Sequence, residues 1–333
     1  MRNSVKYIIL LICLFCLSVS YRMYQSMRLQ VEVIQEFNSK SYTDQTLNKV
    51  LKMDYSFPNI TVTTLPMSDI VAKYLFLSKD FDSALSILDN DNSNSNPHLY
   101  TREILKAEIF AELNVTDSAL YYSKIAFTKM PNNPYYFQFM SKYMNKLGYK
   151  DSIVEYYKLI PDQSQLSNYQ TILAFFANDN NSDNIFIKKL AKKARLTYQS
   201  ENTIQVLSDY VLHGSDNVRA AVKLAENATV LSKDSKYDEV SQLYIEAASL
   251  NPGDYTYFEN AGYTLGLIGK HEEAIPYLSQ VVDSLNPGTG KSEFLLGYSY
   301  GQLGKNDLAC KYLRKSIKLN FQPAYQEFNK VCK

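Results

Sequence analysis

The sequence contains no tryptophan and only 11 glycines, 10 prolines and four cysteines among its 333 residues. With so few glycines and prolines, long stretches are free to form helices, and 28 tyrosines supply aromatic surface for packing between them. This composition argues against disorder. A chain of this length exceeds one compact core, so it predicts either two domains or an elongated array of repeats.

Neither sign of charge dominates the sequence. Lys and Arg total 35 against 34 Asp and Glu, which gives a net charge of +1. This balance provides no electrostatic reason to expect nucleic acid or an acidic surface as a partner. We therefore predict no nucleic-acid partner.

Motifs of common hydrolases and metal sites are also missing, since no GxSxG, HExxH or paired CxxC occurs. The three histidines, His98, His213 and His271, lie far apart, and none has a second ligand type at metal-binding spacing. We expect no metal, no cofactor and no catalytic residue, and hence a protein that is not an enzyme.

One segment resembles the phosphate-binding loop of nucleotide hydrolases. Residues 287–292 read PGTGKS, but the full pattern requires glycine at position 285, where Leu285 stands. Such a loop also joins a strand to a helix, whereas this segment lies between two predicted helices. Pro and Gly ending one helix and Thr or Ser starting the next explain the segment. A nucleotide-binding enzyme remains only a remote alternative.

The N-terminus has the order of a secretory signal. Arg2 and Lys6 precede an apolar run over residues 7–17, and small residues including Ser18 and Ser20 follow it. The apolar run is shorter than the roughly 20 residues of a comfortable transmembrane helix, which favours a cleaved signal.

Other features of this segment favour its retention. Arg22 and Arg28 follow at once, and residues 21–37 contain no Pro or Gly, so one helix can continue from the membrane into the folded part. Residues 1–21 are therefore either a signal peptide or a single transmembrane anchor, which would insert through residues 7–21 if uncleaved. The short amino-terminal tail predicts a single-pass or exported protein with an extracytoplasmic repeat domain, periplasmic in a Gram-negative cell.

Small residues near the C-terminus recur at a fixed interval. One set lies 35 residues after the other, and the pairs are Gly262 with Gly297, Gly269 with Gly304, and Ala274 with Ala309. The surrounding segments resemble the tetratricopeptide repeat (TPR), whose period is roughly 34 residues. This resemblance implies an all-α fold, a TPR-like α-solenoid of antiparallel helix pairs following an N-terminal apolar helix. Gly262 and Gly297 would allow close approach of the paired helix, and Gly269 and Gly304 would supply the turn.

Weaker copies of the pattern extend upstream and divide the chain. The predicted segments are residues 1–21, a signal peptide or anchor; 22–65, a helical or irregular connector; 66–162, degenerate TPR-like repeats; 163–216, divergent helical hairpins; 217–321, C-terminal TPR repeats; and 322–333, a capping helix.

TPR-like arrays present a concave face lined by the first helix of each repeat. In the two best-matched repeats this face is predicted to hold Glu259, Tyr263, Leu267, Phe294, Tyr298 and Gln302. Rigid aromatic groups beside hydrogen-bonding groups suit an extended peptide or a partner helix. The resemblance thus implies a non-enzymatic scaffold for protein interactions at the cell envelope. The alternative is an accessory subunit that braces an envelope polysaccharide or secretion complex.

Two cysteines lie near the C-terminus, on the last repeat helix and the capping helix. Cys310 and Cys332 are expected to approach each other, because these two helices should pack together. An exported protein can join them in a disulfide, which would hold down a terminus that otherwise frays. A pair of buried thiols is the equal alternative.

Overall fold

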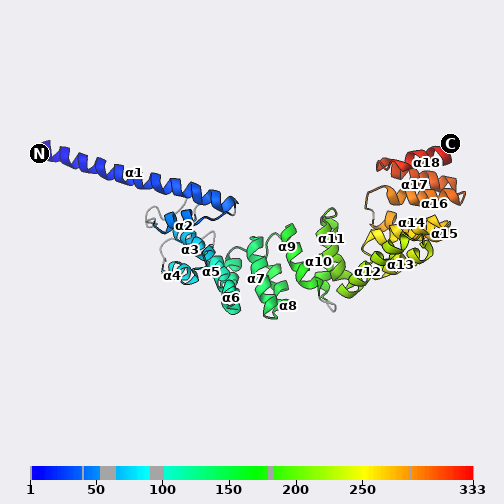
Figure 1. Cartoon of the computed structure of the whole chain (residues 1–333), viewed down its shortest axis with the longest axis horizontal. Helices are drawn as coiled ribbons and strands as arrows, with labels where there is room; N and C mark the ends of the chain where they lie inside the picture. Colours follow the sequence, from blue (N-terminus) through cyan, green and yellow to red (C-terminus); the bar gives the residue numbers. More distant parts are fainter. Residues whose placement is uncertain are drawn as a thin grey trace. The chain divides into compact units, whose positions relative to one another are not determined.

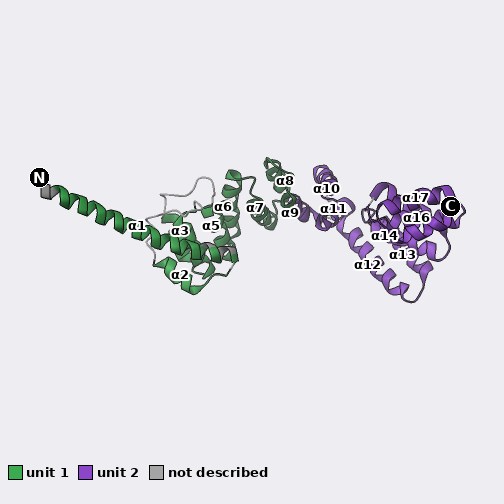
Figure 2. Cartoon of the chain, turned by 90° about the horizontal axis from the view of Figure 1, so that it is seen from above, with its two compact units in different colours: residues 1–168 green, residues 169–333 purple. Residues whose placement is uncertain are grey.

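The computed structural model describes residues 2–39, 41–52, 65–90, 101–178, 184–285 and 287–332. Within these ranges the chain is built from helices and contains no β-strand, which confirms the predicted all-α class (Figure 1). The chain divides into two compact units, Met1–Asn168 (unit 1) and Tyr169–Lys333 (unit 2) (Figure 2).

The N-terminal helix is the longest element. Helix α1 (Arg2–Ser39) runs for 38 residues and passes through the predicted boundary at residues 21 and 22 without a break. Its stretch Val5–Val33 is long and apolar enough to cross a membrane, and the side chains of its apolar first half are exposed, as at Phe15, which is 70% exposed. A signal sequence has the same properties, so both interpretations of this segment stay open.

The second half of α1 packs on the helices that follow it in unit 1. Helix α2 (Asp44–Leu51) begins at the N-cap Thr43 and contacts α1. The carboxylate of Glu36 accepts hydrogen bonds from the hydroxyls of Thr43 at 2.7 Å, Thr46 at 2.6 Å and Tyr74 at 2.9 Å. Val33 is buried in the same cluster of side chains. This polar and apolar contact makes residues after about position 26 of α1 part of the folded unit.

Unit 1 continues as helices that contact their neighbours in sequence. They are α3 (Met67–Leu77), α4 (Phe81–Asn90), α5 (Thr101–Glu112), α6 (Thr116–Lys129), α7 (Pro134–Lys146) and α8 (Lys150–Lys158). Helix α9 (Leu166–Ala177) contains the boundary between the units. This boundary falls inside the segment predicted to form divergent hairpins.

Unit 2 repeats the same arrangement. Its elements are α10 (Ile185–Thr197), α11 (Asn202–His213), α12 (Ser215–Ser232), α13 (Tyr237–Leu250), α14 (Tyr255–Leu267), α15 (His271–Gln280), the short π-helix η1 (Val281–Leu285), α16 (Lys291–Gln302), α17 (Asn306–Lys318) and α18 (Pro323–Val331). Helix α12 runs through the predicted boundary at residues 216 and 217. Helix α18 lies within the predicted capping segment and contacts both α16 and α17.

The repeated glycines have the two roles predicted for them. Gly269 and Gly304 adopt left-handed backbone angles, with φ of 76° and 71°, in the turns after α14 and α16. A Cβ at Gly262 would lie 2.5 Å from Leu278 Cγ, and one at Gly297 would lie 2.9 Å from Leu313 Cγ. Real atoms do not approach so closely, so these glycines are required where the paired helices touch.

Candidate functional site

The six residues of the predicted concave face lie on two first helices of unit 2. Glu259, Tyr263 and Leu267 follow one another at four-residue spacing on α14, and Phe294, Tyr298 and Gln302 do the same on α16. This spacing places each triplet along one face of its helix. The exposed side chains are Tyr263 (44%), Leu267 (48%) and Gln302, whereas Phe294 and Tyr298 are half-buried and Glu259 is buried.

The carboxylate of Glu259 is engaged inside the protein. It forms an ion pair with Lys291 Nζ at 2.7 Å and accepts a hydrogen bond from the Ser292 hydroxyl at 2.5 Å. Both donors lie at the start of α16, so the carboxylate joins α14 to α16. The Lys291 ammonium also lies 5.8 Å from the centre of the Tyr263 ring. Glu259 therefore orders the two helices instead of offering a free charge to a partner.

These contacts also account for the PGTGKS segment. The element before it is η1, not a strand, and Gly290 is the N-cap of α16 with φ of 75°. A Cβ at Gly290 would lie 2.9 Å from Phe321 Cβ, so the backbone passes close to the chain after α17. With Lys291 and Ser292 bound to Glu259, the segment has the geometry of a turn between repeats.

The aromatic members of the face pack partly on their neighbours. The Phe294 ring lies 5.4 Å from the ring of Phe321 and 6.2 Å from that of Tyr298, measured between ring centres. Tyr298 meets the His271 ring edge-on at 5.9 Å. One side of each ring is thus held by the protein, while Tyr263 and Leu267 extend outward.

Unit 1 contains a half-buried carboxylate in a similar arrangement, which sequence reasoning missed. Glu108 on α5 forms an ion pair with Lys73 Nζ on α3 at 2.6 Å. It also accepts a hydrogen bond from the Tyr135 hydroxyl on α7 at 2.5 Å. Burial, and then the charge of Glu108, raises the pKa of Tyr135 well above its usual value. The available signal was the 35-residue spacing of opposite charges at Lys73 and Glu108, which matches the repeat period.

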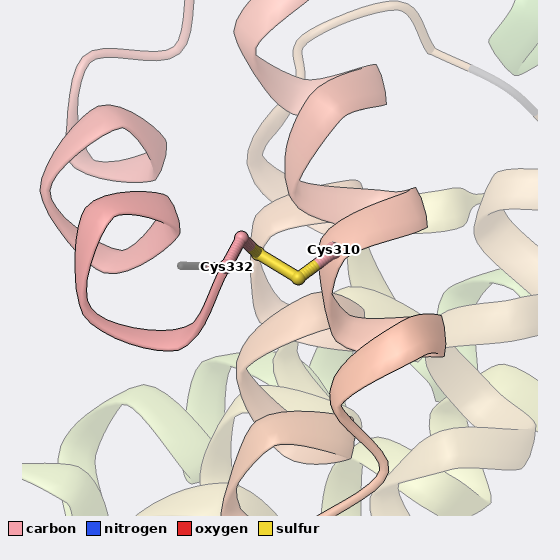
Figure 3. Close-up of a disulfide and its surroundings, with 2 residues drawn as sticks. All are labelled: Cys310 and Cys332. Atoms are coloured by element: carbon pink, nitrogen blue, oxygen red, sulfur yellow. A yellow bond between two sulfur atoms is a disulfide. The ribbon is translucent and has the colours of Figure 1, made fainter.

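The two C-terminal cysteines are paired in the structure. Cys310 on α17 and Cys332, just after α18, form a disulfide with a Cα–Cα distance of 5.6 Å (Figure 3). Cys13 and Cys16 on α1 are free and exposed. In the part of the chain that is described, no cluster of His, Cys, Asp or Glu could hold a metal ion.

A match to a known protein family overlaps the predicted C-terminal repeats. Residues 294–323, which contain most of α16 and all of α17, match the family described as tetratricopeptide repeat. No curated protein matches the sequence. Three solved structures are similar to the chain. The TPR domain of P58(IPK) is 14% identical, with 91% of this chain and 86% of that chain covered and a TM-score of 0.41.

The second structure is a tetratricopeptide repeat protein from Parabacteroides merdae, 14% identical, with 79% of this chain and 96% of that chain covered and a TM-score of 0.37. The third is a complex of the TPR2AB domain of yeast Sti1, 13% identical, with 70% of this chain and 96% of that chain covered and a TM-score of 0.32. Residues 294–323 thus match one tetratricopeptide repeat, and the helix pairs of unit 2, with their turn and contact glycines, have the arrangement expected of such repeats.

Proposed function

We propose that this protein is a non-enzymatic scaffold at the cell envelope that holds a protein or peptide partner on the face of α14 and α16. The observation that carries the proposal is the exposure of Tyr263 and Leu267 on helix α14, where the apolar residues Tyr257, Ala261 and Leu265 are buried. A rigid aromatic and an aliphatic group on a fixed helix provide contact area at low entropic cost.

The charges around this face favour such a role over catalysis. Glu259 and Lys291 neutralise each other at 2.7 Å, and the Ser292 hydroxyl is bound to the same carboxylate. These groups fix the spacing of α14 and α16, and in this arrangement none serves as a general base or a phosphate ligand. Gln302 adds an exposed amide at the end of the face, where it can orient a peptide backbone.

Membrane attachment belongs to this proposal. In an uncleaved chain, the apolar part of α1 would insert in the bilayer and carry the repeats on the extracytoplasmic side. The contact of Glu36 with Tyr74 favours the second candidate function, an accessory subunit that braces an envelope polysaccharide or secretion complex. A membrane helix fixed to the repeats can hold a membrane enzyme, whereas peptide capture requires no such connection.

Site-specific photo-crosslinking tests the binding face. We expect a photoreactive phenylalanine analogue at Tyr263 to crosslink the partner in intact cells. The matched control is the same analogue at Tyr121, an exposed tyrosine on the second helix α6 of another repeat. Equal crosslinking at both positions, or none at Tyr263, would reject the proposed face.

Purification in mild detergent separates the two candidate functions. One stoichiometric membrane partner supports bracing, and several weakly held soluble partners support peptide capture. The intact mass of the mature chain from the same preparation shows whether α1 has been cleaved.

A further inference from the structure

A hollow with a volume of about 250 Å³ lies in unit 2 beside the proposed binding face. Three helices line it: α12 contributes Val222, Ala225, Glu226 and Thr229, α13 contributes Tyr244, and α14 contributes Thr256, Tyr257 and Asn260. Asn260 lies three residues before Tyr263, one helical turn away on the same helix. One lining residue of the hollow is therefore a helical neighbour of the exposed part of the face.

The hollow contains one carboxylate without a positive partner. Glu226 is its only charged lining residue, and the described part of the chain offers its carboxylate no hydrogen bond or ion pair. The Asn260 side chain is also unpaired there. Lys291, the cation near α14, is already held by Glu259 at 2.7 Å.

The remaining lining groups match the rest of a long basic side chain. Val222 is 40% exposed, and it lies with Ala225 on α12, where the two offer apolar surface to a methylene stem. Burial, and then the charges of Asp254 and Asp209, raises the pKa of Tyr257 to about 12. No lining group repels a cation.

We propose that this hollow binds a lysine or arginine side chain of the partner, with Glu226 pairing the ammonium or guanidinium group. The inference rests on the proposed function, because it assigns a specificity position to the same binding surface. It predicts that a basic residue of the partner lies next to the segment that contacts Tyr263.

Short peptide probes test the hollow without the natural partner. We would measure saturation-transfer NMR on the full chain in detergent with acetyl-Ala-Arg-Ala-amide, its lysine analogue and its citrulline analogue, which has the shape of arginine without the charge. The two basic peptides should bind about threefold more tightly than the citrulline peptide, the change expected for one ion pair at an exposed carboxylate.

The variant Glu226→Gln should remove this preference and leave the citrulline peptide unaffected. Glu239→Gln is the matched control, because Glu239 is also exposed but lies on α13 outside the hollow. Val222→Phe, which narrows the hollow without changing charge, should weaken all three peptides. Unchanged far-UV circular dichroism would show that each variant is folded.

Equal binding of the arginine and citrulline peptides, or an unchanged preference in Glu226→Gln, would overturn the assignment. Putrescine binding more tightly than the basic peptides would also overturn it, in favour of a free polyamine. These probe measurements need no partner, so they can fail while photo-crosslinking at Tyr263 succeeds. The hollow and the binding face can therefore be rejected separately.

Discussion

The two units share one spacing pattern but fill it with different residues. In unit 1 the turns after α3, α5 and α7 place Lys79, Asn114 and Gly148 at φ between 59° and 81°, and in unit 2 the turns after α12, α14 and α16 place Ser235, Gly269 and Gly304 at φ between 57° and 76°. Seven residues before each of these six stands a small buried residue; in chain order they are Ala72, Ala107, Ser141, Ala228, Gly262 and Gly297. The fold thus requires a small side chain and a left-handed turn, whereas glycine is only one way to supply them.

The units also differ in how they close one end. Unit 1 is covered by α1 and α2, held through hydrogen bonds to the Glu36 carboxylate. Unit 2 is covered by α18, which is tied to α17 by the Cys310–Cys332 disulfide. A terminal repeat must cover its apolar face, and the two ends do so by non-covalent and covalent contacts respectively.

The largest expected effect concerns the covalent closure. The disulfide joins residues separated by 22 positions. Removing a disulfide that closes a loop of this size lowers the free energy of unfolding by about 3 kcal/mol. We expect Cys332→Ser to increase amide hydrogen exchange in α18 by roughly 100-fold and to leave α1 and α2 unchanged. Mass spectrometry of peptic peptides measures both regions in one experiment.

Thiol labelling provides the control for this prediction. In the denatured, unreduced and uncleaved chain, Cys13 and Cys16 should react and Cys310 and Cys332 should not, until a reductant is added. Labelling of all four cysteines without reductant would mean that α18 is not covalently held.

The next effect tests the small-residue position. Gly262→Leu places atoms where Leu278 already lies, and we expect it to destabilise α14 and α15 by about 1–3 kcal/mol. Gly266→Ala is the control one turn later, where a Cβ would meet only the His271 ring at 3.9 Å. That change should be neutral or stabilising, because alanine favours a helix over glycine. Local hydrogen exchange in α14 and α15 reports both; equal effects would show that close approach does not explain Gly262.

The sequence predicts the fold best in the repeats whose contact and turn positions are occupied by glycine. Gly262, Gly269 and Ala274 with their counterparts near the C-terminus predicted the helix pairs, the close approach and the turns of unit 2. The same turn at Lys79 or Ser235 gives no such signal, because a left-handed backbone at these residues is set by the helices on either side.

The candidate site was less predictable. Helical spacing placed Tyr263 and Leu267 on one exposed face, but the engagement of Glu259 depends on Lys291 and Ser292 in the next repeat. Likewise, the sequence does not show that Glu226 lines a hollow, because this hollow forms only where α12 and α14 lie together. Contacts between repeats decide which charges are free, and one sequence does not specify them.

A smaller effect is expected at the non-covalent closure. Burial alone would raise the pKa of Glu36, but hydrogen bonds from Thr46, Thr43 and Tyr74 lower it below its usual value. The stabilisation is therefore present above the ordinary carboxyl pKa and is lost as pH falls through the lowered one. We expect Glu36→Gln to weaken the contact between α1 and the rest of unit 1 by about 1 kcal/mol at neutral pH and to remove its acid dependence.

Hydrogen exchange in the second half of α1, corrected for the intrinsic pH effect, measures this change. Glu32→Gln is the control, because the pair of Glu32 with Lys49 is exposed and should contribute little. If the Glu32 and Glu36 variants behave alike, the hydrogen bonds of Glu36 do not secure this end of the unit.

The smallest effect compares the turns themselves. A left-handed conformation costs a residue with a Cβ about 1 kcal/mol, and glycine avoids that cost but loses more entropy on folding. Gly269→Ala should therefore destabilise unit 2 by about 1 kcal/mol, while Lys79→Gly should stabilise unit 1 by about 0.5 kcal/mol. Asn114→Gly should change less than Lys79→Gly, because asparagine tolerates this conformation. Hydrogen exchange in the flanking helices measures the order of the three changes. This order tests whether Lys79 adopts, with backbone strain, the same turn that glycine forms in unit 2. A loss of stability in Lys79→Gly would show that contacts of the lysine side chain stabilise the turn by more than its left-handed backbone costs.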